Sequence, residues 1–305
     1  MDDMEKIIIH EVGLRDGLQM EKVVVPSEQK IKWAKNLCAT GIDILQLGSF
    51  VNPAKVPQMA DTDILFKHFN QIENKPKNVI LSALVLNEKG FERGEECGVE
   101  MYNMGVSASE THNYKNTGMT ITESTKRIIS TAKEAIALGR RVQISVQSAF
   151  GCGFEGKISE EKVLAIVDKY LNAGLKNITL ADTAGHAIPD QVSRLFEILF
   201  KRDSTVEWGT HFHNTYGMGI ANCYAALKVG VRYFESSIAG LGGCPFTKVA
   251  AGNVCTEDFV HSLQRSGYRE DIDLTKLIET ARDFSKFFNR ELPGLVYKSG
   301  TVNYR

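Results

Sequence analysis

Two histidines in the segment HFHNTYG, residues 211–217, are the side chains of this sequence with the clearest capacity for chemistry. His211 and His213 stand two positions apart at the end of a β-rich run, and residues i and i+2 of a strand project from the same face. Imidazole nitrogen is the commonest protein ligand for divalent metal ions. The pair therefore indicates a metal site, although two polar residues that merely end a strand would give the same pattern.

The rest of the chain predicts an ordered scaffold for these residues. Short β-branched runs predict eight strands, at residues 6–12, 43–50, 78–86, 101–106, 141–148, 177–183, 206–213 and 231–239. Segments with helical spacing of apolar residues lie between them, among them residues 27–41, 122–139, 159–174, 189–201 and 219–230. Strands that alternate with helices and read as continuous apolar runs favour a closed (β/α)₈ TIM barrel over an open doubly wound sheet.

The domain organisation follows from the same pattern. No low-complexity linker divides the 305 residues, so we expect a single catalytic domain. Residues from about 256 to 305 are charged and helical in pattern, and we interpret them as an appended C-terminal helical segment that closes this domain. Neither a G-x-G-x-x-G fingerprint nor a P-loop is present, so the sequence predicts no nucleotide cofactor.

Composition restricts the partners. With 36 basic and 37 acidic residues and no block rich in Lys and Arg, the chain offers no electrostatic support for binding nucleic acid or a membrane surface. The acidic start and the lack of an apolar run near ~18 residues predict neither a signal peptide nor a membrane span, which leads us to expect a cytoplasmic protein. The six cysteines form no CxxC pair and are expected to be free thiols. A small molecule is the expected partner.

In a TIM barrel, catalytic side chains gather at the carboxyl ends of the strands. The predicted strand ends carry Arg15, Asp16, Gln46, Ser49, Ser107, Glu110, Gln147, Ser148, Asp182, His211, His213, Ser236 and Ser237. Asp16 and the two histidines could converge on one cation. Their mixed oxygen and nitrogen atoms suit Mg²⁺, Mn²⁺ or a related octahedral ion better than a structural zinc.

Several motifs resemble one family of enzymes. EVGLRDGLQMEK (11–22), HFHNTYG (211–217) and AGLGGCPFTKVAAGNVCTED (239–258) are similar to segments of the 3-hydroxy-3-methylglutaryl-CoA lyases, which are metal-dependent barrel lyases. SFVNPAKVPQM (49–59), FGCGFEGKIS (150–159) and LADTAG (180–185) resemble that family too. The motifs keep their order from about residue 6 to about residue 265, which is more specific than any one of them alone.

The resemblance implies a (β/α)₈ barrel, a divalent cation, and retro-Claisen cleavage of a 3-hydroxyacyl-CoA to acetyl-CoA and a keto acid, acetoacetate for the family's own substrate. It assigns the metal ligands as Asp16, His211, His213 and Asn253. Among the catalytic residues, it has Arg15 stabilise the enolate oxygen and Asp182 accept the hydroxyl proton, in relay with His211. Cys244, in the loop GLGGCPF, would donate a proton to the acetyl-CoA carbanion. Family membership also implies a homodimer or larger homo-oligomer.

Plain alternatives stand beside these assignments. Arg15 and Asp16 could be a strand-end ion pair, and Cys244 could be a buried, inert thiol. Asp182 could cap the following helix. Asn253 and Glu257 could belong to a helix start. We expect Glu257, like Asn214, to orient its neighbours rather than touch substrate. Lys22 and Lys55 could approach CoA phosphates, but solvated surface lysines fit the pattern better.

Gln46 departs from the family, which usually carries a glutamate at this position and counts it among the catalytic residues. An amide can accept a hydrogen bond from Arg15 but brings no negative charge and cannot shuttle a proton. Three interpretations stay open: the same substrate with another proton path, lyase or condensing chemistry on a different 3-hydroxyacyl-CoA or a 2-oxo acid, or loss of activity. A competing hypothesis from another class is a non-catalytic barrel that binds metal or ligand without turnover.

Overall fold

A computed structural model describes residues 6–243 and 252–302. In this part of the chain, parallel strands form a closed barrel in which each strand pairs with its neighbours in sequence and β8 pairs with β1. The strands are β1 (Ile8–Glu11), β2 (Ile44–Ser49), β3 (Ile80–Leu84), β4 (Met101–Ser107), β5 (Arg141–Gln147), β6 (Asn177–Asp182), β7 (Glu207–Phe212) and β8 (Tyr233–Ser236). The predicted TIM barrel and its eight strands are confirmed.

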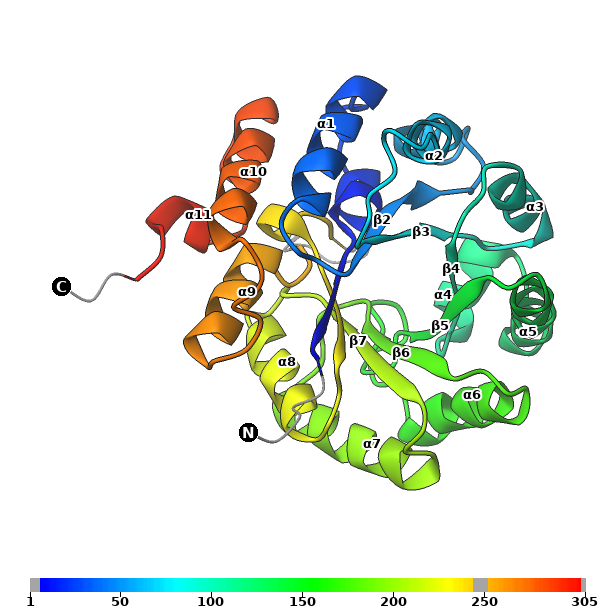
Figure 1. The fold of residues 1–305 in the computed structure, drawn as a ribbon. Helices are drawn as coiled ribbons and strands as arrows, with labels where there is room; N and C mark the ends of the chain where they lie inside the picture. The colour runs from blue at the N-terminus through cyan, green and yellow to red at the C-terminus, as the bar shows by residue number, and fades with distance from the viewer. Residues whose placement is uncertain (1–5, 244–251, 303–305) are drawn as a thin grey trace.

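Helices surround the barrel (Figure 1). They are α1 (Ser27–Cys38), α2 (Thr62–Phe69), α3 (Glu88–Glu96), α4 (Glu110–Thr117), α5 (Ile121–Ala137), α6 (Glu160–Asn172), α7 (Pro189–Arg202) and α8 (Gly219–Lys228). The start of α5 shows how the sequence sets a boundary. The Thr120 side chain accepts the Glu123 N–H while the Glu123 carboxylate accepts the Thr120 N–H, a reciprocal capping box. The expected helices are confirmed, and α2, α3 and α4 are additional.

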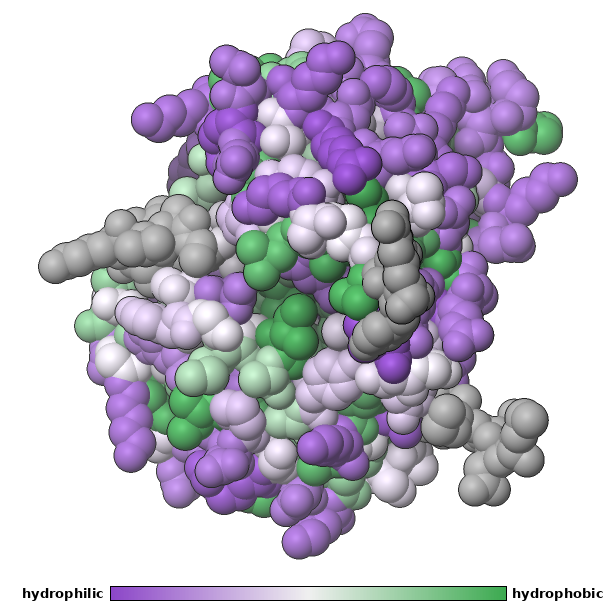
Figure 2. Space-filling view, turned by 90° about the vertical axis from the view of Figure 1, so that its left-hand side faces the viewer, coloured by the Kyte–Doolittle hydropathy of each residue, from purple (hydrophilic) through white to green (hydrophobic). Residues whose placement is uncertain are grey.

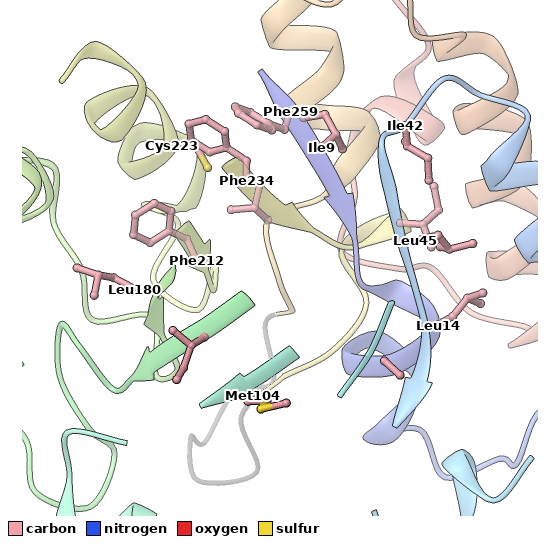
Figure 3. Close-up of a cluster of buried hydrophobic side chains, with 14 of the residues drawn as sticks. Ile9, Leu14, Ile42, Leu45, Met104, Leu180, Phe212, Cys223, Phe234 and Phe259 are labelled. Atoms are coloured by element: carbon pink, nitrogen blue, oxygen red, sulfur yellow. The ribbon is translucent and has the colours of Figure 1, made fainter. Parts of the chain in front are cut away.

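The apolar core lies between the sheet and the helices, not inside the barrel. Every second residue of a strand points outward, and these positions carry large apolar side chains such as Ile9, Leu45, Phe212 and Phe234 (Figure 3). Phe234, for example, packs against Phe259 of α9 (Thr256–Arg265) with ring centroids 5.2 Å apart. The intervening, inward positions are therefore free to carry polar side chains.

The appended C-terminal segment contains α9, α10 (Leu274–Phe287) and α11 (Val296–Ser299), and α10 lies beside α1 (Figure 1). Trp33 of α1 stacks on Phe284 of α10 with ring centroids 3.6 Å apart, and its indole N–H donates to Asp283 at 2.8 Å. The predicted helical segment is thus tied to the barrel by a buried aromatic contact.

The side of the molecule that carries α9, α10 and α11 is shown in Figure 2. Apolar residues gather near the middle of this face and hydrophilic residues surround them; Leu295, which precedes α11, is 65% exposed. None of the helices that the structure describes is both long and apolar enough to cross a membrane. The five cysteines in the described ranges are free thiols, as expected.

Candidate metal centre

Asp16 and Arg15 are held by a tight turn after β1. The N–H groups of Arg15, Asp16 and Gly17 all point to the carbonyl of Val12, which makes residues 13–17 one π-helical turn, η1 (Gly13–Gly17). Such turns are frequent at functional sites because they aim side chains that a regular helix would not. Asp16 is 6% exposed and accepts hydrogen bonds from Arg15 and, at 2.9 Å, from Gln19.

The two histidines project from the end of β7, as the sequence predicts. Their Nε2 atoms lie 3.1 Å apart, and they lie 3.9 Å (His211) and 3.8 Å (His213) from Oδ2 of Asp16. Burial, and next the charge of His211, lowers the pKa of His213 to about 4, so this ring is neutral near pH 7 and offers a lone pair. A neutral imidazole is the form that binds metal ions.

Asn253 reaches the same place through the backbone. Its residue forms an antiparallel bridge with His213, and the next N–H, that of Val254, donates to the carbonyl of Phe212 at 3.0 Å. The Asn253 amide nitrogen donates to Asp16 at 2.8 Å and to the carbonyl of Leu241 at 3.0 Å. Gly242 allows this close approach, because a Cβ there would lie 2.5 Å from that amide nitrogen and its φ of +108° disfavours any other residue.

These four side chains fit a divalent cation. Ligand atoms of Asp16, His211 and His213 all lie within 4.8 Å of one another. The Asn253 Oδ1 atom is buried and has no hydrogen-bond partner among the described residues, so it could accept a cation. Burial opposes the ionised form of Asp16, but Arg15 and then the histidines hold the pKa of this carboxyl well below its usual range. The set therefore offers oxygen and nitrogen donors around one negative charge.

Glu235 on β8 is a site residue that the sequence analysis missed. Its Oε2 lies 2.8 Å from Nδ1 of His211, and its Oε1 lies 3.9 Å from Nδ1 of the buried His10. Although burial acts in the opposite direction, the bond to His211 lowers the pKa of Glu235. Burial opposes the charged form of His211, but the bond to Glu235 raises the pKa of this ring, so a bound cation would have to displace the proton on Nε2. A carboxylate that accepts the Nδ1–H of a histidine fixes the ring so that Nε2 faces the metal position. The signal in the sequence was an acidic residue inside the apolar run of the last strand.

Replacing Glu235 with alanine is expected to weaken Mn²⁺ binding about 10- to 100-fold, because His211 would lose the group that fixes its tautomer and ring orientation. Glu235→Gln, which can still accept the Nδ1–H, should retain most of the affinity. Titration calorimetry with Mn²⁺ measures both variants. Equal affinity in Glu235→Ala and the unaltered protein would remove this role.

Arg15 connects the metal position to Gln46. Its Nε donates to Oε1 of Gln46 and one terminal nitrogen donates to Asp16. The structure thus brings together the predicted strand-end pair and the departing amide. All three side chains line a cavity of about 540 Å³ at the mouth of the barrel, together with His211, His213 and Glu235. This volume is in the range of small-molecule sites.

Asp182 lies elsewhere. Neighbouring residues of its strand, Ala181 and Thr179, line the cavity, whereas Asp182 does not; it shares the outward parity of Leu180. Its carboxylate accepts the N–H groups of His186 at 2.8 Å and Ala187 at 3.1 Å, and burial raises its pKa to about 7. This geometry suits neither the base role that the family resemblance implies nor a cap of α7, because α7 begins at Pro189 and its N-cap, Ile188, has no side-chain cap hydrogen bond. Asp182 instead holds the turn that follows β6.

Asn214 and Glu257, which we expected to orient their neighbours, each accept a hydrogen bond from a backbone N–H group. Asn214 accepts the N–H of Gly219, the first residue of α8, at 2.9 Å. Buried Glu257 accepts the N–H of Ala239 at 2.9 Å, where the chain turns with a φ of 55°. Both contacts support loops at the barrel mouth and neither reaches the cavity lining.

Stability should depend on pH through Glu257. Burial raises the pKa of this carboxyl to about 8 from an ordinary value of 4.5, so the folded state holds its proton more tightly than the unfolded chain. Its contribution to stability is therefore complete below about pH 4.5 and is lost as pH rises toward 8. We compare the melting temperature of Glu257→Gln with that of the unaltered protein at the same pH. We expect this difference to be a few degrees more favourable to the variant at pH 8 than at pH 5.

Thermal unfolding followed by circular dichroism measures this difference across pH. The exposed Glu270→Gln is the matched control, since it removes a carboxyl from the same part of the chain. A melting difference for Glu257→Gln that stays constant from pH 5 to 8 would contradict the assignment.

Cys244 and two lysines are further sequence candidates for a place near the substrate or CoA. Cys244 lies outside the described residues, so its proposed proton donation stays a prediction. Lys55 lines the cavity rim and is exposed, and Lys22 is exposed and lies outside the cavity lining. Gly240 and Gly242, which precede Cys244 in the same loop, both have positive φ, a conformation that favours glycine.

Comparisons with known proteins place these residues in context. A family model described as HMGL-like matches residues 6–284. A (R)-citramalyl-CoA lyase of Chloroflexus aurantiacus is 36% identical in an alignment that covers 98% of this chain and 96% of that protein. A hydroxymethylglutaryl-CoA lyase of Pseudomonas mevalonii is 37% identical over 273 residues, 89% of each.

Solved structures agree. An HMG-CoA lyase from Acinetobacter baumannii, in complex with coenzyme A and 3-methylmalate, superposes with a TM-score of 0.93 at 36% identity and covers 100% of this chain and 98% of its own. The Bacillus subtilis HMG-CoA lyase gives a TM-score of 0.91 at 33% identity, with 96% and 97% covered.

Proposed function

Since this chain belongs to the HMGL-like family and is a carbon-carbon lyase that acts on a CoA thioester, we propose that it cleaves a 3-hydroxyacyl-CoA to acetyl-CoA and a keto acid by a metal-dependent retro-Claisen reaction. The observation that carries the proposal is the convergence of Asp16, His211 and His213 at the cavity, with Asn253 bonded to Asp16 and its Oδ1 atom without a hydrogen-bond partner among the described residues. Candidate substrates are 3-hydroxy-3-methylglutaryl-CoA and citramalyl-CoA, after the names of the relatives.

A divalent cation, Mg²⁺ or Mn²⁺, would be held by these four side chains and would lower the pKa of the substrate hydroxyl. The chain's own residues then have separate tasks. Arg15, fixed between Asp16 and Gln46, points a permanent positive charge at the cavity and stabilises the thioester oxygen as it becomes an enolate. Glu235 keeps His211 oriented.

Two assignments differ from those that the resemblance implies or go beyond the described residues. Asp182 stabilises the turn after β6 and is not proposed as the base, because both its oxygens accept backbone N–H groups outside the cavity. Cys244 is retained as the residue that returns a proton to the acetyl-CoA carbanion.

The test is turnover with defined cations. Purified protein is stripped with a chelator and then assayed for acetyl-CoA release from each candidate thioester with and without added Mg²⁺ or Mn²⁺. We expect release only with the cation, and the keto acid, acetoacetate or pyruvate, in equal amount. Tight Mn²⁺ binding without acetyl-CoA release from either thioester would instead support the non-catalytic binding barrel.

A further inference from the structure

The inside of the barrel is polar over much of its depth. Inward positions carry His10 on β1, Gln46 on β2, Asn103 on β4, Gln143 on β5 and Glu235 on β8, and the cavity reaches all of these except His10. TIM barrels usually fill this space with branched aliphatic side chains. A cavity that extends into a polar lumen indicates a ligand whose inserted end bears oxygen atoms.

Gln46 has a fixed orientation in this lumen. A guanidinium can only donate, so the side-chain oxygen of Gln46 must face Arg15, and its NH₂ group must point elsewhere. That amide nitrogen is buried and has no hydrogen-bond partner among the residues that the structure describes, while the residue as a whole is 0% exposed. Buried donors are rarely left unpaired in proteins. A ligand acceptor is the natural partner for this N–H.

The charge of that acceptor follows from the surroundings. Arg15 is the cation beside Gln46. The amide at position 46 adds no negative charge to balance that of Arg15. A glutamate at this position would partly neutralise Arg15 and would repel an anionic ligand. An anionic oxygen is therefore better accommodated here than it would be beside a carboxylate. Arg15 also links Gln46 to the candidate metal ligand Asp16, because it donates a hydrogen bond to each of them.

We propose that Gln46 is a specificity-determining residue that donates a hydrogen bond to a carboxylate attached directly to the carbinol carbon of the substrate. The inference rests on the proposed function, which places the substrate hydroxyl at the candidate metal centre. Because Arg15 bonds both Asp16 and Gln46, a carboxylate on the same carbon as that hydroxyl would lie within reach of Arg15 and Gln46, whereas a carboxylate one methylene further would be displaced from them. The substrate class is thus a malyl-type thioester.

The reaction on such a substrate balances without another reagent. The hydroxyl loses its proton to water, and the bond between the carbinol carbon and the α-carbon of the thioester breaks. Its electron pair passes to the thioester enolate while the carbinol carbon becomes a carbonyl. A proton returned to the α-carbon gives acetyl-CoA, and the other product is a 2-oxo acid.

The kinetic test compares citramalyl-CoA, assayed as each enantiomer, with 3-hydroxy-3-methylglutaryl-CoA, whose carboxylate is one methylene further from the carbinol carbon. With Mn²⁺ present, we expect the unaltered enzyme to prefer one citramalyl-CoA enantiomer by about tenfold or more in kcat/KM. Gln46→Glu should raise KM for that thioester about 10- to 100-fold and change kcat/KM for the other by no more than about threefold. Gln46→Met, which keeps the length but has no donor, should show an intermediate loss.

Gln147→Glu is the matched control, because it adds the same charge to the same cavity from the end of β5. It should change kcat/KM for the two thioesters by similar factors. A preference of the unaltered enzyme for 3-hydroxy-3-methylglutaryl-CoA, or an equal loss on both thioesters in Gln46→Glu, would overturn the proposal.

A binding measurement separates this inference from the proposed function. Calorimetry on the Mn²⁺-loaded protein compares free citramalate with free 3-hydroxy-3-methylglutarate. Should neither thioester be cleaved, the proposed function fails, but tighter citramalate binding that is lost in Gln46→Glu still supports the carboxylate site. Equal binding of the two acids in the unaltered protein and the variant counts against it.

Discussion

Replacing His213 with alanine is expected to weaken Mn²⁺ binding ~100-fold or more and to reduce acetyl-CoA release by a similar or larger factor. Loss of a residue that only orients a metal ligand typically weakens binding about 10- to 100-fold, and loss of the ligand itself should cost more. His213 gives a clean test. Its Nδ1 atom has no hydrogen-bond partner in the described part of the chain, and its Nε2 atom bonds only one side chain there, His211, which keeps its own bond to Glu235. Calorimetry with Mn²⁺ and a turnover assay at saturating Mn²⁺ measure the two effects.

His186→Ala is the matched control for this experiment. His186 lies in the turn after β6, and its contact with Asp182 is made by its backbone N–H, which alanine retains. This variant should bind Mn²⁺ as the unaltered protein does. If His213→Ala also binds Mn²⁺ normally, the histidine pair is structural and the plain alternative for the H-x-H motif is correct.

Replacing Arg15 with lysine is expected to lower kcat about 10²- to 10³-fold, the loss typical when a group that stabilises an oxyanion is removed. Lysine keeps the charge but cannot bond Gln46 and Asp16 at once through a planar fork. The enolate would therefore form without a fixed donor. Single-turnover rates at saturating thioester and Mn²⁺ measure the chemical step directly.

As a control, the Mn²⁺ affinity of the Arg15→Lys variant is measured and compared with that of the unaltered protein. Arg15 bonds Asp16, so some change is expected, but it should be smaller than the change in kcat. A loss of turnover that merely follows a loss of Mn²⁺ affinity, and recovers at high Mn²⁺, would assign Arg15 to the strand-end ion pair instead of to the enolate.

The barrel was predictable from the sequence because each strand is a short β-branched run bounded by turn residues. The helices α2, α3 and α4 were less so. Each has only eight or nine residues; α3 contains two glycines, and α4 is rich in Thr and Asn, which are poor helix formers. Packing against the barrel, not local propensity, must stabilise them.

The polar lumen was hidden by the same feature that identified the strands. Runs such as DILQLGSF and VRYFESSIA are apolar enough to predict buried strands, yet Gln46 and Glu235 occupy their inward positions. A period-2 inspection of each run would have separated the apolar outward residues from the polar inward ones.

The same parity explains the site residues that the sequence misplaced or missed. Asp182 ends β6 as expected, but its side chain lies on the same outward face of the strand as that of Leu180. A position at the end of a strand does not by itself determine which face the side chain takes. Glu235 is hard to recognise in the sequence because Ser236 and Ser237, which follow it directly, are polar and mark the end of the last strand. By contrast, Asp16, His211, His213 and Asn253 are gathered as the motifs indicate, even though Asn253 is 40 residues beyond His213 in the chain.

The most direct test of the metal centre is a crystal of this protein soaked with manganese, with diffraction recorded for anomalous scattering from the metal. We expect one strong anomalous peak in the cavity, bound by a carboxylate oxygen of Asp16, the Nε2 atoms of His211 and His213, and Oδ1 of Asn253. Absence of a peak there, or a peak that leaves two or more of these atoms unbound, would contradict the account.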